Sequence, residues 1–242
     1  MADMVSVKRP PTNLFAQEPQ IRIGRSQFDR SHGLKTTFDV SYLYPILVDE
    51  ILPGDTFTCS LNGFARILSP LKSPIMDNIE LETFFFFVPA RLLWTNWAAF
   101  NGEHDAMGAQ DTDYTIPVLS GAGDSAHDAV PTSYKRLMAQ MGLPDGLVPN
   151  SIDVNALPFR AYNLIYNEWF RDQNVVDEIT VSMTDGPDSQ SAYVLQKSAK
   201  KHDYFTSALP YLQKGDASTF STTAQTLDVF ADTTFGNPLK ID

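Results

Sequence analysis

Apolar and polar positions alternate along the first ordered part of the chain. Within Thr36–Val48 the even positions from 38 to 46 are apolar, while Thr37, Asp39 and Ser41 on the other register are polar. This period of two is typical of a half-buried β-strand. The turn residues Pro53-Gly54-Asp55 follow and predict a reversal of the chain. The apolar positions are Phe38, Val40, Tyr42, Tyr44 and Ile46.

Two further strands are predicted by the same alternation. Thr56–Leu68 places Cys59 on its apolar face, where we expect it to be buried, and Gly63 marks a bulge. Ile79–Val88 begins with alternation and ends in four successive phenylalanines, at positions 84–87. A strand that is apolar on both faces is buried on both. We therefore expect its far half, with Phe85 and Phe87, to need a second layer, which a neighbouring subunit can supply.

Three segments change to a period near 3.6 and predict helices. They are Pro89–Phe100, Thr132–Met141 with Gly142 after its end, and Ala156–Asp172. In the third segment we expect one aromatic face to be buried and the polar side chains to lie largely elsewhere. That face consists of Tyr162, Ile165, Tyr166, Trp169 and Phe170, and the polar set of Asn163, Asn167, Glu168 and Arg171.

Polar stretches connect these elements. Asn101–Val130 has little periodicity and predicts a long surface excursion. Thr180–Met183 predicts a brief strand, and Thr184–Ser191 a turn or an exposed loop after it. From Ser218 the chain is rich in Thr, Ser and Asp and lacks a closing strand. The pattern as a whole predicts a mainly β chain with helical insertions, consistent with an antiparallel β-sandwich.

Composition agrees with a folded domain rather than a disordered or membrane chain. The 242 residues are 43% hydrophobic, and the first 20 lack the apolar core of a signal peptide. The most apolar run, Phe84–Val88, is far too short to span a bilayer, so no membrane insertion is expected. The single cysteine cannot form an internal disulfide, which fits either a reducing compartment or a protein that needs no covalent cross-link.

Charge is distributed unevenly along the chain. The total is −11, but residues 1–35 hold six basic and three acidic side chains, which gives +3 and leaves −14 on the remainder. We interpret 1–35 as an N-terminal arm that either is a solvated terminus or lies against packaged nucleic acid. The candidate nucleic-acid-binding residues are Lys8, Arg9, Arg22 and Arg25.

Residues capable of catalysis or metal binding occur without a supporting pattern. None of the four histidines has a second ligand at zinc spacing, and His104-Asp105 and His127-Asp128 lie in polar loops. Glu80 and Glu82 share one face of a predicted strand, as a glycosidase pair would, but a solvent-facing or inter-subunit polar edge is the favoured interpretation. We expect no enzyme activity, no catalytic residue, no metal site and no cofactor.

Three stretches together resemble one viral protein family. They are GRSQFDRSHGLKTTFDVSYLYPILVDEILPGD (24–55), FRAYNLIYNEWFRDQN (159–174) and KHDYFTSALPYLQKG (201–215). In this order they are similar to blocks of the major capsid protein of microviruses, single-stranded DNA bacteriophages, and most of all to its gokushovirus branch. The family's protein is longer, so the chain resembles its N-terminal portion.

The resemblance implies an architecture and a function. Residues 36–242 would be part of one viral jelly roll, an antiparallel β-sandwich that is incomplete in this chain, with helical and loop insertions. Copies would assemble into an icosahedral T=1 capsid around single-stranded DNA, in the virion, after production in the host bacterial cytoplasm. Other partners would be further virion proteins and a host surface receptor. Expected packing and assembly residues are Phe38, Tyr42, Phe85, Phe87, Tyr162, Tyr166, Trp169 and Phe170.

Two other functional classes are compatible with the residues. In a β-sandwich carbohydrate-binding or glycosidase domain, Trp94 and Trp97 would stack on a sugar beside the paired carboxylates. A nucleic-acid-binding regulator would use the basic arm, although the charge of −14 elsewhere disfavours it. The His202-Asp203 pair invites a catalytic interpretation, but in the resembled family its block belongs to the shell.

Overall fold

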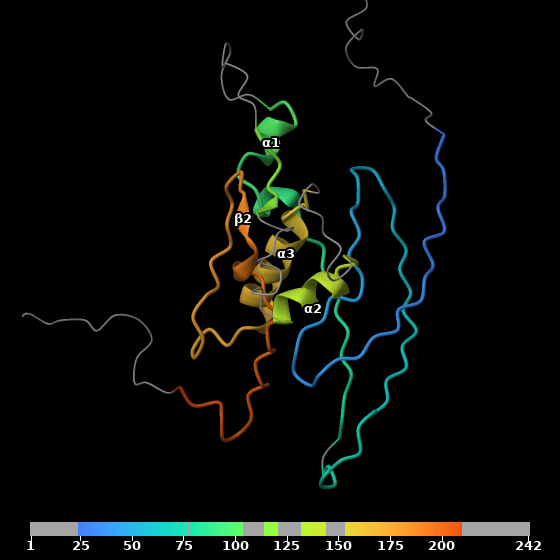
Figure 1. Cartoon of the computed structure of the whole chain (residues 1–242), viewed down its shortest axis with the longest axis vertical. Helices are drawn as coiled ribbons and strands as arrows, with labels where there is room; N and C mark the ends of the chain where they lie inside the picture. The colour runs from blue at the N-terminus through green and yellow to red at the C-terminus, as the bar shows by residue number, and fades with distance from the viewer. Residues whose placement is uncertain (1–23, 77, 104–113, 121–131, 144–152, 210–242) are drawn as a thin grey trace, which may run out of the picture. The chain divides into compact units, whose positions relative to one another are not determined.

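The computed structural model describes residues 24–76, 78–103, 114–120, 132–143 and 153–209, in two units (Figure 1). The first unit is Met1–Thr37, and its described residues, 24–37, contain no helix or strand. The second unit, Phe38–Asp242, contains all the elements that follow. The division into an arm of residues 1–35 and a domain of residues 36–242 stays a prediction.

Two helices confirm the predicted helical periods. Helix α2 spans Thr132–Gln140, and Gly142 follows it with a positive φ of 88°, a conformation that glycine adopts without steric cost. Helix α3 spans Leu157–Ile165, with Pro158 in its first turn. It continues as the π-helix η3, Tyr166–Phe170, in which the Arg171 amide donates to the Tyr166 carbonyl at 2.9 Å.

The predicted helix after Pro89 is interrupted. A 3₁₀ turn, η1, spans Ala90–Leu92, and a four-residue helix, α1, spans Trp97–Phe100. Between them the Thr95 amide donates to the Met183 carbonyl at 3.0 Å rather than to a helical carbonyl. This tertiary hydrogen bond replaces the helical one, which explains the break.

A small parallel sheet joins distant parts of the second unit. Strand β1, Leu119–Ser120, pairs with β2, Asp188–Ser189, in the register Leu119 to Asp188, and the 3₁₀ turn η4, Gln190–Ala192, follows β2. Both lie away from Thr180–Met183, so the brief strand predicted there is wrong. The predicted turn after it is present at Gly186, whose φ is 80°.

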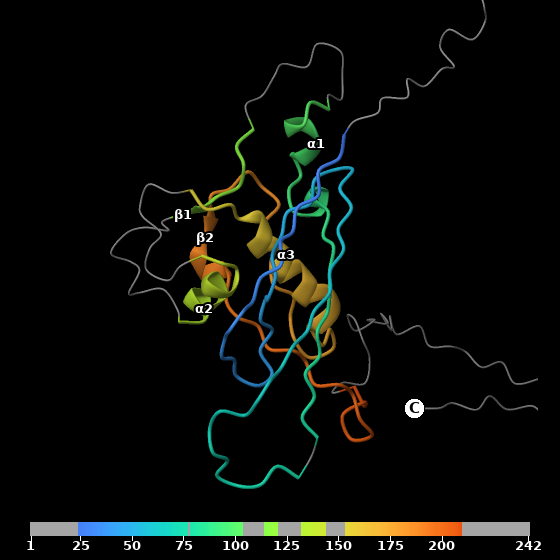
Figure 2. The ribbon, with the colours of Figure 1, turned by 90° about the vertical axis from the view of Figure 1, so that its right-hand side faces the viewer.

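The hydrophobic core lies between α2, α3 and the segment 193–195. Tyr134 and Phe159 bring the two helices into contact, with ring centroids 6.2 Å apart, and Figures 1 and 2 show the helices side by side. Phe159 also contacts Tyr193 at 5.5 Å. The buried cluster consists of Leu119, Tyr134, Leu137, Met138, Val154, Ala156, Phe159, Tyr193 and Leu195.

The alternating segments of residues 38–88 run without regular strand pairing among the described residues. Figures 1 and 2 draw them as long tubes without arrows. A single antiparallel bridge, Tyr42 with Lys197, ties them to the core, and the predicted turn is confirmed by a hydrogen bond from the Asp55 amide to the Leu52 carbonyl. Strand pairing requires a partner, and here the three predicted strands find almost none. Of the described helices, none has the length and apolar character needed to cross a membrane.

Candidate assembly surface

A buried arginine connects the segments that support the candidate assembly surface. Arg160 is fully buried in α3, and its guanidinium donates to both carboxylate oxygens of Asp188, each at 2.7 Å. Its remaining N–H groups donate to the carbonyls of Leu93 at 2.9 Å and Thr184 at 2.8 Å. One side chain thus joins η1, the 182–188 turn and β2 to the central helix.

Tyr193 completes this cluster, and its hydroxyl donates to Asp188 Oδ2 at 2.5 Å. Burial raises the pKa of the Asp188 carboxyl, but hydrogen bonds from Arg160 and Tyr193 outweigh it and hold that pKa below its usual value. Burial and the adjacent carboxylate raise the pKa of the Tyr193 hydroxyl. The ion pair is therefore locked in its charged form at neutral pH.

A second carboxylate fixes the same turn from its other side. Asp185 accepts hydrogen bonds from Trp94 Nε1 at 2.5 Å and from Asn96 Nδ2 at 2.9 Å. Trp94 has no exposed surface and packs against Trp97 and Phe100. Both its ring and its polar atom are therefore engaged inside the fold.

The aromatic residues of the first predicted strand differ in how far they are buried. Tyr42 and Tyr44 are half-buried against the core cluster, and Lys197 lies 5.0 Å from the centre of the Tyr42 ring. Phe38 is 50% exposed but contacts the Tyr44 ring. The Tyr162 hydroxyl donates to the Leu43 carbonyl and accepts from the Gln196 amide, so α3 fixes both segments of this bridge.

The phenylalanine run has one covered face and one open face. Phe84 and Phe86 pack against Phe170, with centroids 5.4 and 5.8 Å from its ring, and Phe86 also contacts Trp169. Phe85 and Phe87 lie on the other register and are 63% and 73% exposed. The expected second layer over them is not supplied by the described residues of this chain.

The predicted aromatic face of the third helix is wrong for Trp169, which is 71% exposed. Tyr166 is buried, whereas Tyr162 and Phe170 are half-buried. The π-helical turn explains the difference, because its wider spacing rotates later side chains away from the face set by α3.

Two polar residues expected away from that face are buried instead. Asn163 donates to the Ala192 carbonyl at 3.3 Å, and Asn167 exchanges two hydrogen bonds with the backbone of Ile179. The side-chain amides of Asn163 and Asn167 thus bond to backbone groups of Ala192 and Ile179, which have no partner strand in a β-ladder among the described residues. Cys59 also differs from its prediction, because it is free and exposed on a segment that lacks a sheet partner.

Residues 200–206 form a turn that is anchored at its base. Asp203 Oδ1 accepts hydrogen bonds from the amides of Phe205 and Thr206, and Lys200 pairs with Asp203. Lys201 pairs with Glu82, and His202 Nε2 lies 3.4 Å from Asp172 Oδ2. Tyr204 and Phe205 at the tip are 92% and 86% exposed, with their rings 5.5 Å apart in an edge-to-face contact.

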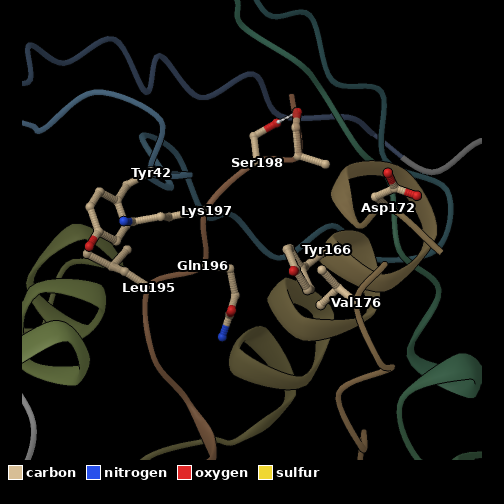
Figure 3. A pocket seen from close by; sticks show the side chains of 9 residues that line it. Tyr42, Tyr166, Asp172, Val176, Leu195, Gln196, Lys197 and Ser198 are labelled. Atoms are coloured by element: carbon tan, nitrogen blue, oxygen red, sulfur yellow. Dashed lines mark hydrogen bonds between the residues drawn. The ribbon is translucent and has the colours of Figure 1, made fainter. Parts of the chain in front are cut away.

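A cavity of about 440 Å³ lies beside this turn. Figure 3 shows Tyr42, Leu195 and Lys197 on one side of it and Tyr166, Asp172 and Val176 on the other. A smaller cavity of about 260 Å³ lies between Phe84, Trp169 and the segment 198–202. The two cavities share Asp172, Ser198 and Ala199, so they form adjacent hollows on the surface that carries the turn.

Of the candidate nucleic-acid-binding residues, the structure describes only Arg25. Lys8, Arg9 and Arg22 lie outside the described residues, and Arg25 is exposed in the first unit. His104 and His127 also lie outside them. No group of three metal-binding side chains occurs among the residues that the structure describes.

Sequence reasoning missed the Arg160, Asp188 and Tyr193 cluster. An arginine in an amphipathic helix normally lies on the solvated face, and its partner is 28 residues away. A local signal was the proline and glycine beside Asp188, which indicated a fixed turn. Nothing in the periodicity indicated that an ion pair would be buried there.

Comparisons with known proteins assign a family to this arrangement. Residues 16–237 match the family described as Capsid protein (F protein). The chain is 46% identical over 203 residues to Capsid protein VP1 of Bdellovibrio phage phiMH2K and 44% identical over 224 residues to Capsid protein VP1 of Chlamydia phage 1. Each match covers 84% of this chain and 36% of the relative.

A more distant relative agrees. Capsid protein VP1 of Spiroplasma virus 4 is 30% identical over 215 residues, which cover 82% of this chain. The chain spans about a third of the length of the curated relatives that it matches. The match to the family includes all of the second unit's described elements, and the chain belongs to the capsid protein (F protein) family of microviruses.

Proposed function

We propose that this chain forms part of the structural subunit of an icosahedral bacteriophage capsid. The observation that carries the proposal is the set of alternating segments 38–88, which rest on a well-packed helical core while large apolar side chains remain exposed along them. Val40, Phe64 and Met76 are 86%, 90% and 92% exposed. Such surfaces in a soluble assembly are covered by further protein.

The architecture we propose is the viral jelly roll, in which these segments pair with strands contributed by the rest of the subunit. Family membership supports it, as does the length of the relatives, of which this chain matches 36%. Helices α2 and α3 would then be insertions that fix one end of the sheet. The subunit would assemble with copies of itself in a T=1 shell, and its role would be structural rather than catalytic.

The shell would enclose a single-stranded DNA genome, with the basic arm of residues 1–35 on its inner side. The +3 charge of that arm supports this arrangement, since phosphate neutralisation needs no defined pocket. Assembly would take place in the cytoplasm of the host bacterium and yield a virion. Contacts with other virion proteins and a host receptor belong to the same proposal.

The carbohydrate-binding alternative is disfavoured by the position of the tryptophans. A stacking platform presents an open ring, but Trp94 is fully buried and its Nε1 is bonded to Asp185. Glu82, one of the two candidate carboxylates, pairs with Lys201. One member of each candidate pair, Trp94 and Glu82, is therefore engaged within the chain.

Assembly of a chimeric subunit tests the proposal. The matching stretch of Capsid protein VP1 from phage phiMH2K is replaced by this chain, and particles are sought by sedimentation and electron microscopy. We expect closed shells of the size formed by the unmodified relative. A control chimera carries Arg160→Met, which removes the buried ion pair and should prevent shells. Folded chimeras that bind saccharides and remain monomeric would contradict the proposal.

A further inference from the structure

We propose that Tyr204 and Phe205 form an aromatic anchor that seats in the cavity lined by Tyr42, Tyr166 and Leu195 of a second copy, a contact that rests on the function proposed above. The proposal names the partner, a second subunit, and the two surfaces that meet. It also predicts that the contact is reciprocal.

The anchor is held in position before any partner binds. Hydrogen bonds from the Phe205 and Thr206 amides to Asp203 fix the turn, and His202 Nδ1 lies 2.9 Å from the Thr206 carbonyl. The ion pair of Lys201 with Glu82 and the contact of His202 Nε2 with Asp172 tie the base to two separate segments. Because the turn is fixed, the two rings lose little conformational freedom on binding.

Charge around the anchor favours a protein partner over single-stranded DNA. Aromatic side chains beside lysines could serve as a stacking platform for bases. Here Lys200 pairs with Asp203, Lys201 with Glu82 and His202 with Asp172. Neutralised charges around exposed Tyr and Phe rings match the polar rim and aromatic centre of a protein interface.

The cavity offers a complementary surface on the same part of the molecule. Its volume of about 440 Å³ is within the range of roughly 300–1,000 Å³ found for sites that enclose drug-sized groups, so it has room for the ring pair. Tyr166 and Leu195 contribute apolar surface, while Gln196 and Ser198 add polar groups (Figure 3). The residues 196–199 that line it directly precede the anchored turn.

A protruding anchor beside a matching hollow makes one self-complementary patch. When two such patches meet, the anchor of each copy reaches the cavity of the other, and the pair is related by a two-fold axis. An icosahedral shell contains two-fold axes between identical subunits. We therefore expect the contact to be isologous, with both anchors seated.

Directed cross-linking tests the geometry. In a Cys59→Ser background, a size-tagged full chain with Tyr204→Cys is mixed with an untagged full chain with Val176→Cys, and disulfides are formed by mild oxidation. Val176 lines the cavity and is 44% exposed, so the change leaves the core intact. We expect the mixed disulfide to exceed that of a control pair, Glu103→Cys with Val176→Cys, because Glu103 is exposed and belongs to neither surface. Equal yields in the two mixtures would overturn the proposal.

Weakened self-association provides the second test. We expect Y204A/F205A to raise the dimer dissociation constant of the full chain by at least about tenfold in sedimentation, with Glu103→Ala as the exposed control that leaves it unchanged. An unchanged constant in Y204A/F205A would overturn the anchor. Reduced binding of a single-stranded oligonucleotide with normal self-association would also overturn it and assign the rings to nucleic acid. Shell formation by the chimera is scored separately, so the proposed capsid role can stand while this contact fails.

Discussion

Arg160 and Asp188 form a bidentate ion pair in which both side chains are buried, and both nitrogen-to-oxygen distances are 2.7 Å. The guanidinium also satisfies backbone carbonyls at residues 93 and 184. Charges this far from water are tolerated when every donor and acceptor is matched. The pair thus holds together four segments that carry little regular secondary structure of their own.

Removal of the arginine should be strongly destabilising. We expect Arg160→Met to lower the free energy of unfolding by about 3–5 kcal/mol, because it leaves the Asp188 carboxylate buried without its cation. Urea denaturation followed by fluorescence measures the change. Arg136→Met is the matched control, since Arg136 pairs with Asp39 on the surface and should leave stability unchanged. Equal effects of the two substitutions would contradict the role assigned to Arg160.

Acid should weaken the fold through the same carboxylate. The pKa of Asp188 lies below its ordinary value of 3.8, so its contribution to stability is complete above that value and is lost as the pH falls below it. We expect the urea concentration at the midpoint of unfolding to decrease when the pH falls below about 4. Asp188→Asn should be less stable at neutral pH but show a smaller acid dependence. A parallel dependence in both proteins would assign the acid sensitivity to other carboxylates.

The sequence predicted elements that depend on local periodicity and missed those that depend on distant partners. The helices at 132–140 and 157–165 were predictable because their period is set by neighbours three and four residues away. Strands β1 and β2 are two residues long and carry no period, and residues 69 apart form the pair. The position of Trp169 was not predictable because a π-helical turn shifts the register without a clear sequence signal.

The same contrast between local pattern and distant partners applies to the residues of the candidate site. The uninterrupted run Phe84–Phe87 predicted a strand with two apolar faces, and the structure covers one of them with Phe170. Burial of Asn163 and Asn167 depends on carbonyl and amide groups of segments that come later in the chain. The interface expected at Phe85 and Phe87 stays a prediction, because both side chains are exposed among the described residues.

Gly186 should be irreplaceable for a steric reason. An added Cβ would lie 3.3 Å from the backbone of Pro117 and Val118, and its φ of 80° is strained for other residues. We expect Gly186→Ala to destabilise the chain by about 3 kcal/mol. Gly142→Ala shares the positive φ but meets open space, so it should cost about 1–2 kcal/mol. Thermal and urea unfolding of both variants measure the two costs. The difference between them gives the part that is due to the close approach at Gly186 rather than to the positive φ.

The basic arm should influence DNA content rather than folding. We expect deletion of Met1–Gln20 from the chimeric subunit to lower the DNA packaged per particle, because Lys8 and Arg9 are lost. The ratio of absorbance from nucleic acid to that from protein in purified particles measures the change. Replacement of Lys8 and Arg9 by glutamine is the control that removes charge and keeps length. Unchanged packaging in both variants would exclude a DNA contact by these residues.

Tyr166 and Trp169 should separate folding from assembly, although both belong to the face first predicted to be buried. Tyr166 is 7% exposed, so Tyr166→Ala should cost about 3 kcal/mol by leaving a cavity in the packed interior. Trp169 is 71% exposed, so Trp169→Ala should change the free energy of unfolding of this chain by no more than about 0.5–1 kcal/mol. If its ring is covered by another part of the shell, the same substitution in the chimera should reduce particle yield. A Trp169 variant that unfolds as readily as the Tyr166 variant would show that the tryptophan is covered within the chain itself, whereas wild-type particle yield would exclude it from the interface.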